Sequence, residues 1–98
     1  MPLQIRYSHR AKFEYKEIIV YVIQNFGLEK AAKIDSLFEK SIYQISINPK
    51  IYPIFDKKRN IRKCVLSKQT SLYYKITGKH IDLISFRGNL MNPENINF

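Results

Sequence analysis

The side chains in this sequence that are best suited to chemistry are cations in its second half. Arg62, Lys68 and Arg87 fall on or beside segments that alternate as strands do. An arginine guanidinium can pair with two phosphate oxygens at once, and a lysine adds a compact positive charge. Metal-independent cleavage of RNA requires such cations directed at the phosphoryl oxygens, together with a general base and a general acid. The three residues are therefore candidates for a phosphate site.

Metal and cofactor chemistry have no matching pattern in this sequence. His9 and His80 have no cysteine, histidine or acid nearby at ligand spacing, so we expect no metal site. The three glycines are scattered and form no phosphate-binding loop, and we expect no cofactor. Cys64 is the single cysteine and lies in an apolar-patterned segment. We expect it to be a small buried residue in a protein of the reducing cytoplasm.

The chain length and the net charge limit the classes of protein to which this sequence can belong. The 98 residues predict one domain, spanning 1–98. The net charge is +9, of which residues 49–98 contribute +7, from ten Lys/Arg and three Asp/Glu. A small domain this basic usually meets an anionic partner. No stretch approaches the length of roughly 18 apolar residues that a membrane span needs, and no signal-peptide pattern opens the chain.

The hydrophobic period changes within the first half of the chain. Leu3 to Tyr7 alternates apolar and polar residues, which indicates a short strand. From Ala11 the apolar residues recur every three or four positions, as in a helix that Ser8 can cap and Gly27 can end. The apolar stripe of this helix should contain Ala11, Tyr15, Ile18, Ile19, Val22 and Phe26, while Lys12, Glu14, Lys16, Glu17 and Gln24 face water.

A second helix is predicted from Leu28 to the Asn48-Pro49 pair, where proline stops it. The tight connection at Gly27 predicts that the two helices form an antiparallel hairpin. The stripe that the second helix turns toward the core should contain Ala31, Ile34, Phe38, Ser41, Ile42 and Ile45.

The second half predicts a surface loop followed by three strands. The loop spans Lys50–Asn60 and carries the basic run Lys57-Lys58-Arg59. Tyr73 and Tyr74 should point to opposite faces of the middle strand, one into the core and the other toward a partner. The strands are expected at Ile61–Lys68, Thr70–Thr77 and Lys79–Phe86, with Gly78 in the last turn and a polar tail at 89–98.

The order of elements is therefore β-α-α-β-β-β. A helical hairpin must bury its apolar stripe, and a sheet with one apolar face offers the surface to bury it on. The sequence predicts an α+β domain in which the helical hairpin packs on a small, mostly antiparallel sheet.

This arrangement resembles the RelE/ParE toxin superfamily. The resemblance covers nearly the whole chain and depends on the order and spacing of short motifs. The long hairpin is more similar to the ParE branch, or the large plasmid-stabilisation group, than to compact RelE. The matching residues are Ala11, Val22–Gly27, Ala32, Ile45, Asn48-Pro49, Tyr52-Pro53, Arg62, Ser71–Ile76, Ile81–Phe86 and Asn92-Pro93.

The resemblance implies a toxin of a type II toxin–antitoxin system, neutralised by the C-terminal segment of a cognate antitoxin. ParE-like members poison DNA gyrase, whereas RelE-like members cut messenger RNA on the ribosome. The antitoxin segment should be acidic, to match the basic half of this chain, and the two proteins should form a hetero-oligomer. The antitoxin segment could add a strand to the sheet edge or lie as a helix along the hairpin.

Two positions favour the ParE-like branch. RelE-like enzymes place one arginine on the middle strand, where this chain has Ser71, and another before Asn-Pro, where it has Leu90-Met91. The tail also supplies no tyrosine or histidine. The alternative is a ribosome-dependent endoribonuclease that uses Arg62, Lys68 and Arg87. A third interpretation is a stand-alone basic nucleic-acid-binding domain, whose affinity would fall steeply with salt.

Overall fold

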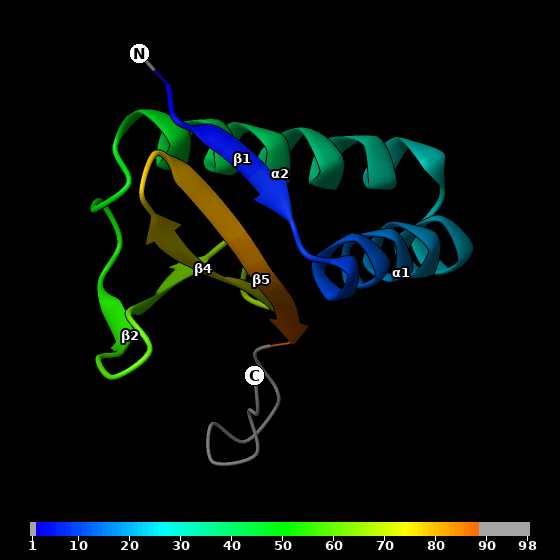
Figure 1. The fold of residues 1–98 in the computed structure, drawn as a ribbon. Coiled ribbons are helices and arrows are strands. Elements are labelled where there is room, and N and C mark those ends of the chain that lie inside the picture. The colour runs from blue at the N-terminus through cyan, green and yellow to red at the C-terminus, as the bar shows by residue number, and fades with distance from the viewer. Residues whose placement is uncertain (1, 89–98) are drawn as a thin grey trace.

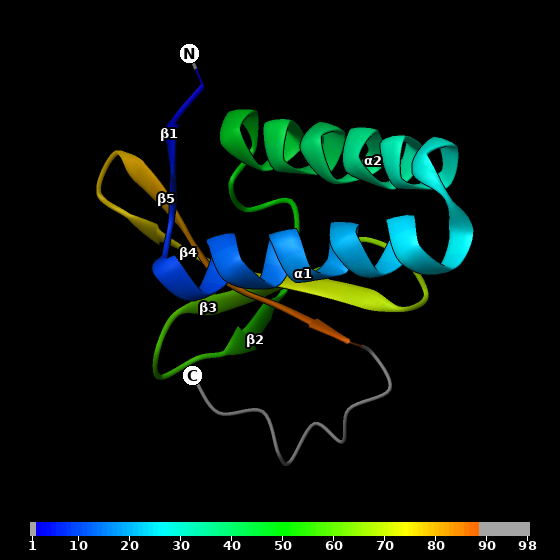
Figure 2. The same ribbon diagram turned by 90° about the vertical axis from the view of Figure 1, so that its right-hand side faces the viewer.

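The computed structural model describes residues 2–88 and shows two antiparallel helices lying on one side of a five-stranded sheet (Figures 1 and 2). None of the helices within this range is long and apolar enough to cross a membrane. The elements are β1 (Gln4–Tyr7), α1 (His9–Phe26), α2 (Leu28–Ile47), β2 (Ile54–Asp56), β3 (Ile61–Val65), β4 (Thr70–Thr77) and β5 (His80–Gly88).

The strand order in space is β1-β5-β4-β3-β2. β1 runs parallel to β5, and the other three pairings are antiparallel. The α+β class, the helical hairpin and the mostly antiparallel sheet are thus confirmed. The prediction of a loop over Lys50–Asn60 was wrong in part, because Ile54–Asp56 forms the edge strand β2 beside β3. Three residues next to a proline are too few to show a strand period.

The start of α1 is fixed by Ser8, as its sequence position predicts. The Ser8 hydroxyl accepts a hydrogen bond from the Ala11 amide at 2.9 Å. It also donates to the Ile84 carbonyl at 2.9 Å, which joins the helix start to β5. One side chain therefore caps the helix and sets its position against the sheet.

A single residue, Gly27, connects the two helices. Its φ of 91° and ψ of 169° lie outside the range that residues with a Cβ readily adopt. The Gly27 amide donates to the Ile23 carbonyl at the end of α1, and its carbonyl accepts from the Ala31 amide in α2. One glycine thus ends one helix and begins the next, so the hairpin turns within the shortest possible connection.

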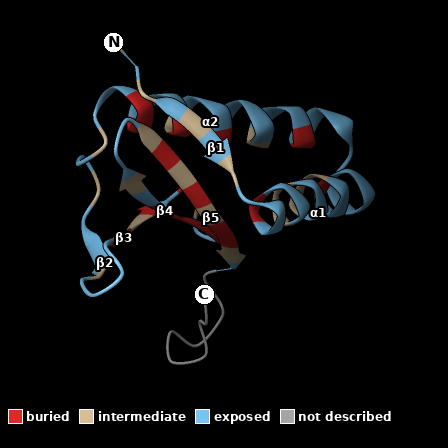
Figure 3. Ribbon diagram, in the orientation of Figure 1, coloured by how far each residue is buried: buried red, intermediate tan, exposed pale blue. Residues whose placement is uncertain are grey.

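The core lies between the hairpin and one face of the sheet, where Figure 3 shows the buried segments of α2, β4 and β5. Tyr15 packs edge-on against Phe38 and Phe86, with ring centroids 5.6 and 5.1 Å apart. Cys64 is fully buried, as predicted, and burial raises the pKa of its thiol. The buried core residues include Ala11, Phe38, Ile42, Ile45, Cys64, Leu66, Leu72, Tyr74, Ile81, Leu83 and Phe86.

An irregularity in β5 shapes the surroundings of α1. Tyr73 pairs with Ser85, but the next residue, Tyr74, pairs with Leu83, so Ile84 is an extra residue in β5. β1 pairs with β5 only as far as Leu83. Beyond that point α1 lies along the edge of β5, and its side chains meet backbone groups that a strand would otherwise satisfy.

Two assignments within α1 were wrong. Phe26 was expected in the buried stripe but is 63% exposed. Glu14 was expected to face water but is half-buried against β5. Helical period predicts which side chains share a face, and it does not say what lies opposite that face.

Candidate functional site

Arg62 lies on β3, and its guanidinium supports the chain that leaves α2. Its Nη1 donates to the Tyr52 carbonyl at 2.7 Å. The neighbouring Tyr74 hydroxyl donates to the Pro49 carbonyl at 2.7 Å. Burial raises the pKa of Tyr74 to about 12, although the nearby Arg62 charge opposes the shift. Arg62 and Tyr74 therefore both hold the segment after α2 against the sheet.

Arg87 lies on β5 and is already engaged with an acid of α1. Its Nε donates to the Ser85 hydroxyl at 2.8 Å and is 3.7 Å from the Glu14 carboxylate. The Arg87 side chain is only 12% exposed. A cation this enclosed and paired contributes less to the external field than a solvated one does.

The structure does not bring Arg62 and Arg87 together. Directly paired residues share a face of a sheet, and faces alternate along a strand. Arg62 pairs with Tyr74, whereas Arg87 pairs with Ser71, which in turn pairs with Val65. Because residues 62 and 65 are three apart on β3, the two arginines lie on opposite faces. Arg62 is on the face that carries the core residue Tyr74.

Lys68 lies neither on β3 with Arg62 nor on β5 with Arg87. The strand predicted to run to residue 68 ends at Val65, and Lys68 is an exposed residue of the β3–β4 turn. The turn is closed by the Leu66 and Ser67 amides, which both donate to the Thr70 carbonyl. The three candidate site residues are thus found on two faces and one turn.

On the face of the sheet away from the helices, Phe55 of the edge strand β2 packs on Tyr73 of β4. Tyr73, the tyrosine expected to point toward a partner if Tyr74 entered the core, is 1% exposed. The Phe55 ring packs against it edge-on, with centroids 4.9 Å apart. The Lys63 ammonium lies 5.7 Å from the Phe55 centroid and 5.9 Å from the Tyr73 centroid. Tyr73 is therefore a packed residue of this face.

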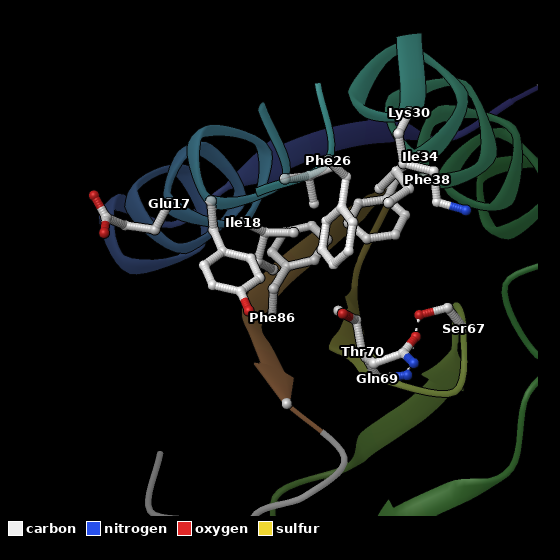
Figure 4. A pocket seen from close by; sticks show the side chains of 13 residues that line it. Glu17, Ile18, Phe26, Lys30, Ile34, Phe38, Ser67, Gln69, Thr70 and Phe86 are labelled. Carbon is white, nitrogen blue, oxygen red and sulfur yellow. Dashed lines mark hydrogen bonds between the residues drawn. The ribbon is translucent and has the colours of Figure 1, made fainter. Parts of the chain in front are cut away.

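An apolar groove of about 720 Å³ lies between the helical hairpin and the ends of β4 and β5. Figure 4 shows Phe26, Ile34 and Phe38 gathered on its helical side, with Gln69 and Thr70 across from them. Glu17 and Lys30 lie at its rim. We call this hollow the hairpin groove. It is lined by Glu17, Ile18, Tyr21, Val22, Phe26, Lys30, Ile34, Phe38, Ser67, Gln69, Thr70, Phe86 and Gly88.

The hairpin groove was not predicted from the sequence, although the end of α1 carries a signal for it. Tyr21 and Phe26 are large apolar residues at the end of α1, and both are more than half exposed. Their rings contact each other edge-on, with centroids 6.4 Å apart. Tyr21 lies outside the apolar stripe predicted for this helix, and a large apolar residue beyond that stripe indicates a surface that a partner covers.

Within residues 2–88, no three His, Cys, Asp or Glu side chains gather into a group that could hold a metal ion. Part of the resemblance and of the departures from it, at Leu90-Met91 and Asn92-Pro93, lies outside the described residues.

Solved structures of toxin–antitoxin proteins have a similar arrangement of helices and strands. A structure of the chromosomal ParDE system of P. aeruginosa superposes with a TM-score of 0.74 at 15% identity, covering 88% of this chain and 95% of that one. The YoeB dimer of Staphylococcus aureus superposes with a TM-score of 0.64 at 19% identity, covering 89% and 97%. The chain has the RelE/ParE toxin fold.

The same fold is found in the DinJ–YafQ toxin–antitoxin complex of E. coli, with a TM-score of 0.62 at 16% identity, covering 94% of this chain and 100% of that one. No family model and no curated protein sequence matches this chain. The RelE/ParE fold is therefore recognised here through the arrangement of the backbone, at identities too low to carry residue roles.

Proposed function

We propose that this protein is the toxin of a type II toxin–antitoxin pair and acts inside the cell in the ParE manner. It would bind a macromolecular target such as DNA gyrase rather than cut RNA, and a cognate antitoxin would neutralise it. The fold shared with ParDE, YoeB and YafQ structures supports the toxin class. The net charge of +9 supports an acidic antitoxin segment.

The observation that favours binding over cleavage is the separation of Arg62 from Arg87 across the sheet. A phosphoryl-transfer site needs its cations to converge on the same oxygens. Arg62 instead donates to the Tyr52 carbonyl, and Arg87 lies beside the Glu14 carboxylate. Both arginines therefore have partners within the fold. A protein that acts by binding does not need these arginines to contact a phosphate, so their partners are compatible with that mode of action.

The hairpin groove is the place we assign to the antitoxin. Its helical wall is apolar, its rim carries Glu17 and Lys30, and the turn that forms the opposite wall carries Lys68, so lysines outnumber acids around it. An amphipathic segment with apolar side chains at helical spacing and acids on its flanks would match both features. Burial of Phe26 and Tyr21, which are exposed in the isolated chain, would supply much of the affinity.

Two assays with the purified protein test the mode of action. We expect inhibition of DNA supercoiling by gyrase, and no new cleavage sites in a translated message mapped by primer extension. Cleavage of the message with gyrase unaffected would overturn the ParE-like proposal. In that case the Arg62→Ala and Arg87→Ala variants would show whether these residues belong to the nuclease, because its cleavage should then fall by orders of magnitude.

Neutralisation is tested by expression in a bacterial host. The protein alone should arrest growth, and co-expression of the adjacent reading frame should restore it. A protein that is harmless when expressed, and whose thermal stability is unchanged by that neighbour's product, would contradict the toxin assignment, since a bound partner must stabilise the folded state.

A further inference from the structure

Several donors from separate parts of the chain converge on the carboxylate of Glu14. Its Oε1 accepts from the Ser85 hydroxyl at 2.7 Å and from the Phe86 amide at 3.3 Å. Its Oε2 lies 3.7 Å from Arg10 Nε and 3.7 Å from Arg87 Nε. Two hydrogen-bond donors and two guanidinium groups thus surround one anionic group.

The donors around Glu14 are held in place by the fold. Ser85 is fully buried, and it accepts a 2.8 Å hydrogen bond from Arg87 while it donates to Glu14. The Phe86 amide is at the edge of β5, beyond the point where β1 stops. Preorganised donors of this kind bind an oxyanion without first paying to orient themselves.

We propose that Ser85, the Phe86 amide, Arg10 and Arg87 form a phosphate-binding site that the chain fills with the Glu14 carboxylate. A phosphate group presents the same kind of acceptor oxygens as a carboxylate, and arginine pairs with either. Glu14 acts as an internal competitor, because it is tethered on α1 beside the site and neutralises one of the two positive charges. This proposal goes beyond the toxin assignment and does not depend on the target.

An internal competitor has a measurable effect on binding. A tethered group is present at an effective concentration of the order of millimolar, so a free phosphate at lower concentration is excluded. Removal of the Glu14 charge should release the site without creating new contacts elsewhere. A merely structural Glu14 would also cost stability when replaced, but its loss would not create phosphate affinity at Ser85 and Phe86.

The test uses Glu14→Gln, which keeps an acceptor oxygen for Ser85, and Glu14→Ala, which empties the site. Glu29→Gln is the matched control, because Glu29 is an acid on α2 with a side chain 91% exposed, and its replacement raises the net charge equally. The probes are inorganic phosphate and a 5′-phosphorylated single-stranded RNA oligonucleotide. Backbone amide NMR shifts at Ser85 and Phe86, with the Arg87 Nε resonance, report binding at the site.

We expect both Glu14 variants to bind a phosphate probe at least about tenfold more tightly than the native protein, since a unit charge a few ångströms from the ligand is removed. The Glu29→Gln variant should bind like the native protein, and adding Arg87→Ala to Glu14→Gln should abolish the gain. A response to inorganic phosphate alone assigns a small-anion site, and a stronger response to the oligonucleotide assigns a nucleic-acid phosphate site.

Equal gains in Glu14→Gln and Glu29→Gln would overturn the proposal, because net charge alone would then explain binding. A gain that survives Arg87→Ala would do the same. The native protein gives a further test that needs no Glu14 variant: saturable shifts at Ser85 and Phe86 with submillimolar phosphate would overturn the proposal, because an internal competitor excludes phosphate at that concentration.

Discussion

The Tyr15 hydroxyl of α1 donates a 2.5 Å hydrogen bond to the Asp35 carboxylate of α2. The same hydroxyl lies 3.1 Å from Glu39, one turn further along α2. The pKa of Tyr15 is raised far above its ordinary value, mainly by burial and secondly by the hydrogen bond to Asp35. This contact fixes the spacing of the two helices, and the helices form one wall of the hairpin groove.

Replacement of Tyr15 by Phe should therefore lower the free energy of unfolding by about 1.5 to 2 kcal/mol, because the ring packing is kept and the hydroxyl's hydrogen bonds to the Asp35 and Glu39 carboxylates are lost. Urea denaturation measures the change. Tyr43→Phe is the control, since Tyr43 is an exposed tyrosine on α2. Equal stability of the Tyr15→Phe variant and the native protein would show that the contact does not fix the hairpin.

Replacement of Ser8 by Ala should cost about 1 to 2 kcal/mol of stability, because one hydroxyl both caps α1 and donates to the Ile84 carbonyl. Ser36→Ala, in the exposed middle of α2, should have almost no effect. Thermal unfolding of both variants compares the two positions. A loss at Ser36 as large as the loss at Ser8 would refute this role of the cap.

The buried Tyr74 should make stability fall at high pH. Its pKa is about 12 in the folded protein and near the ordinary value of 10 when unfolded. The unfolded chain therefore releases this proton first as pH rises. The stability that protonated Tyr74 contributes is fully present below pH 10. Between pH 10 and 12 the folded protein loses about 2 to 3 kcal/mol of this stability.

Urea denaturation across that pH range, on the native protein and Tyr74→Phe, isolates this contribution from the titration of lysines. The variant should be less stable at neutral pH, because the Pro49 carbonyl loses its donor, and its stability should fall less steeply. Parallel pH profiles for the two proteins would exclude Tyr74 as the cause.

The sequence predicted the parts of the fold that local patterns determine. The Ser8 cap, the Gly27 connection and the hairpin strands around Gly78 each depend on a few neighbouring residues, and each is found where it was expected. The short strand β2 was missed because its three residues gain their strand character by pairing with Arg62 and Ile61 of β3. Pairing of that kind leaves no period in the sequence.

The candidate site was predicted less well because it depends on register. Whether Arg62 and Arg87 share a face follows from which residues of β3, β4 and β5 pair, and an extra residue at Ile84 alters that count. The burial of Glu14 likewise follows from where β1 ends. These pairings join segments that are far apart in the sequence. The residue types therefore identified candidate cations but could not show which of them lie on the same face of the sheet.

The hairpin groove is expected to receive an acidic antitoxin segment, and a calorimetric titration measures this interaction. The titrant is the acidic C-terminal segment encoded by the adjacent reading frame, and the proteins are the native chain, Phe26→Ala and Phe13→Ala. Phe26 lines the groove and is 63% exposed, whereas Phe13, also on α1, is 64% exposed and is not among the groove residues. We expect Phe26→Ala to weaken binding roughly tenfold or more, about 1.4 kcal/mol, and Phe13→Ala to leave it unchanged. Native affinity in Phe26→Ala, or an equal loss in both variants, would contradict the claim.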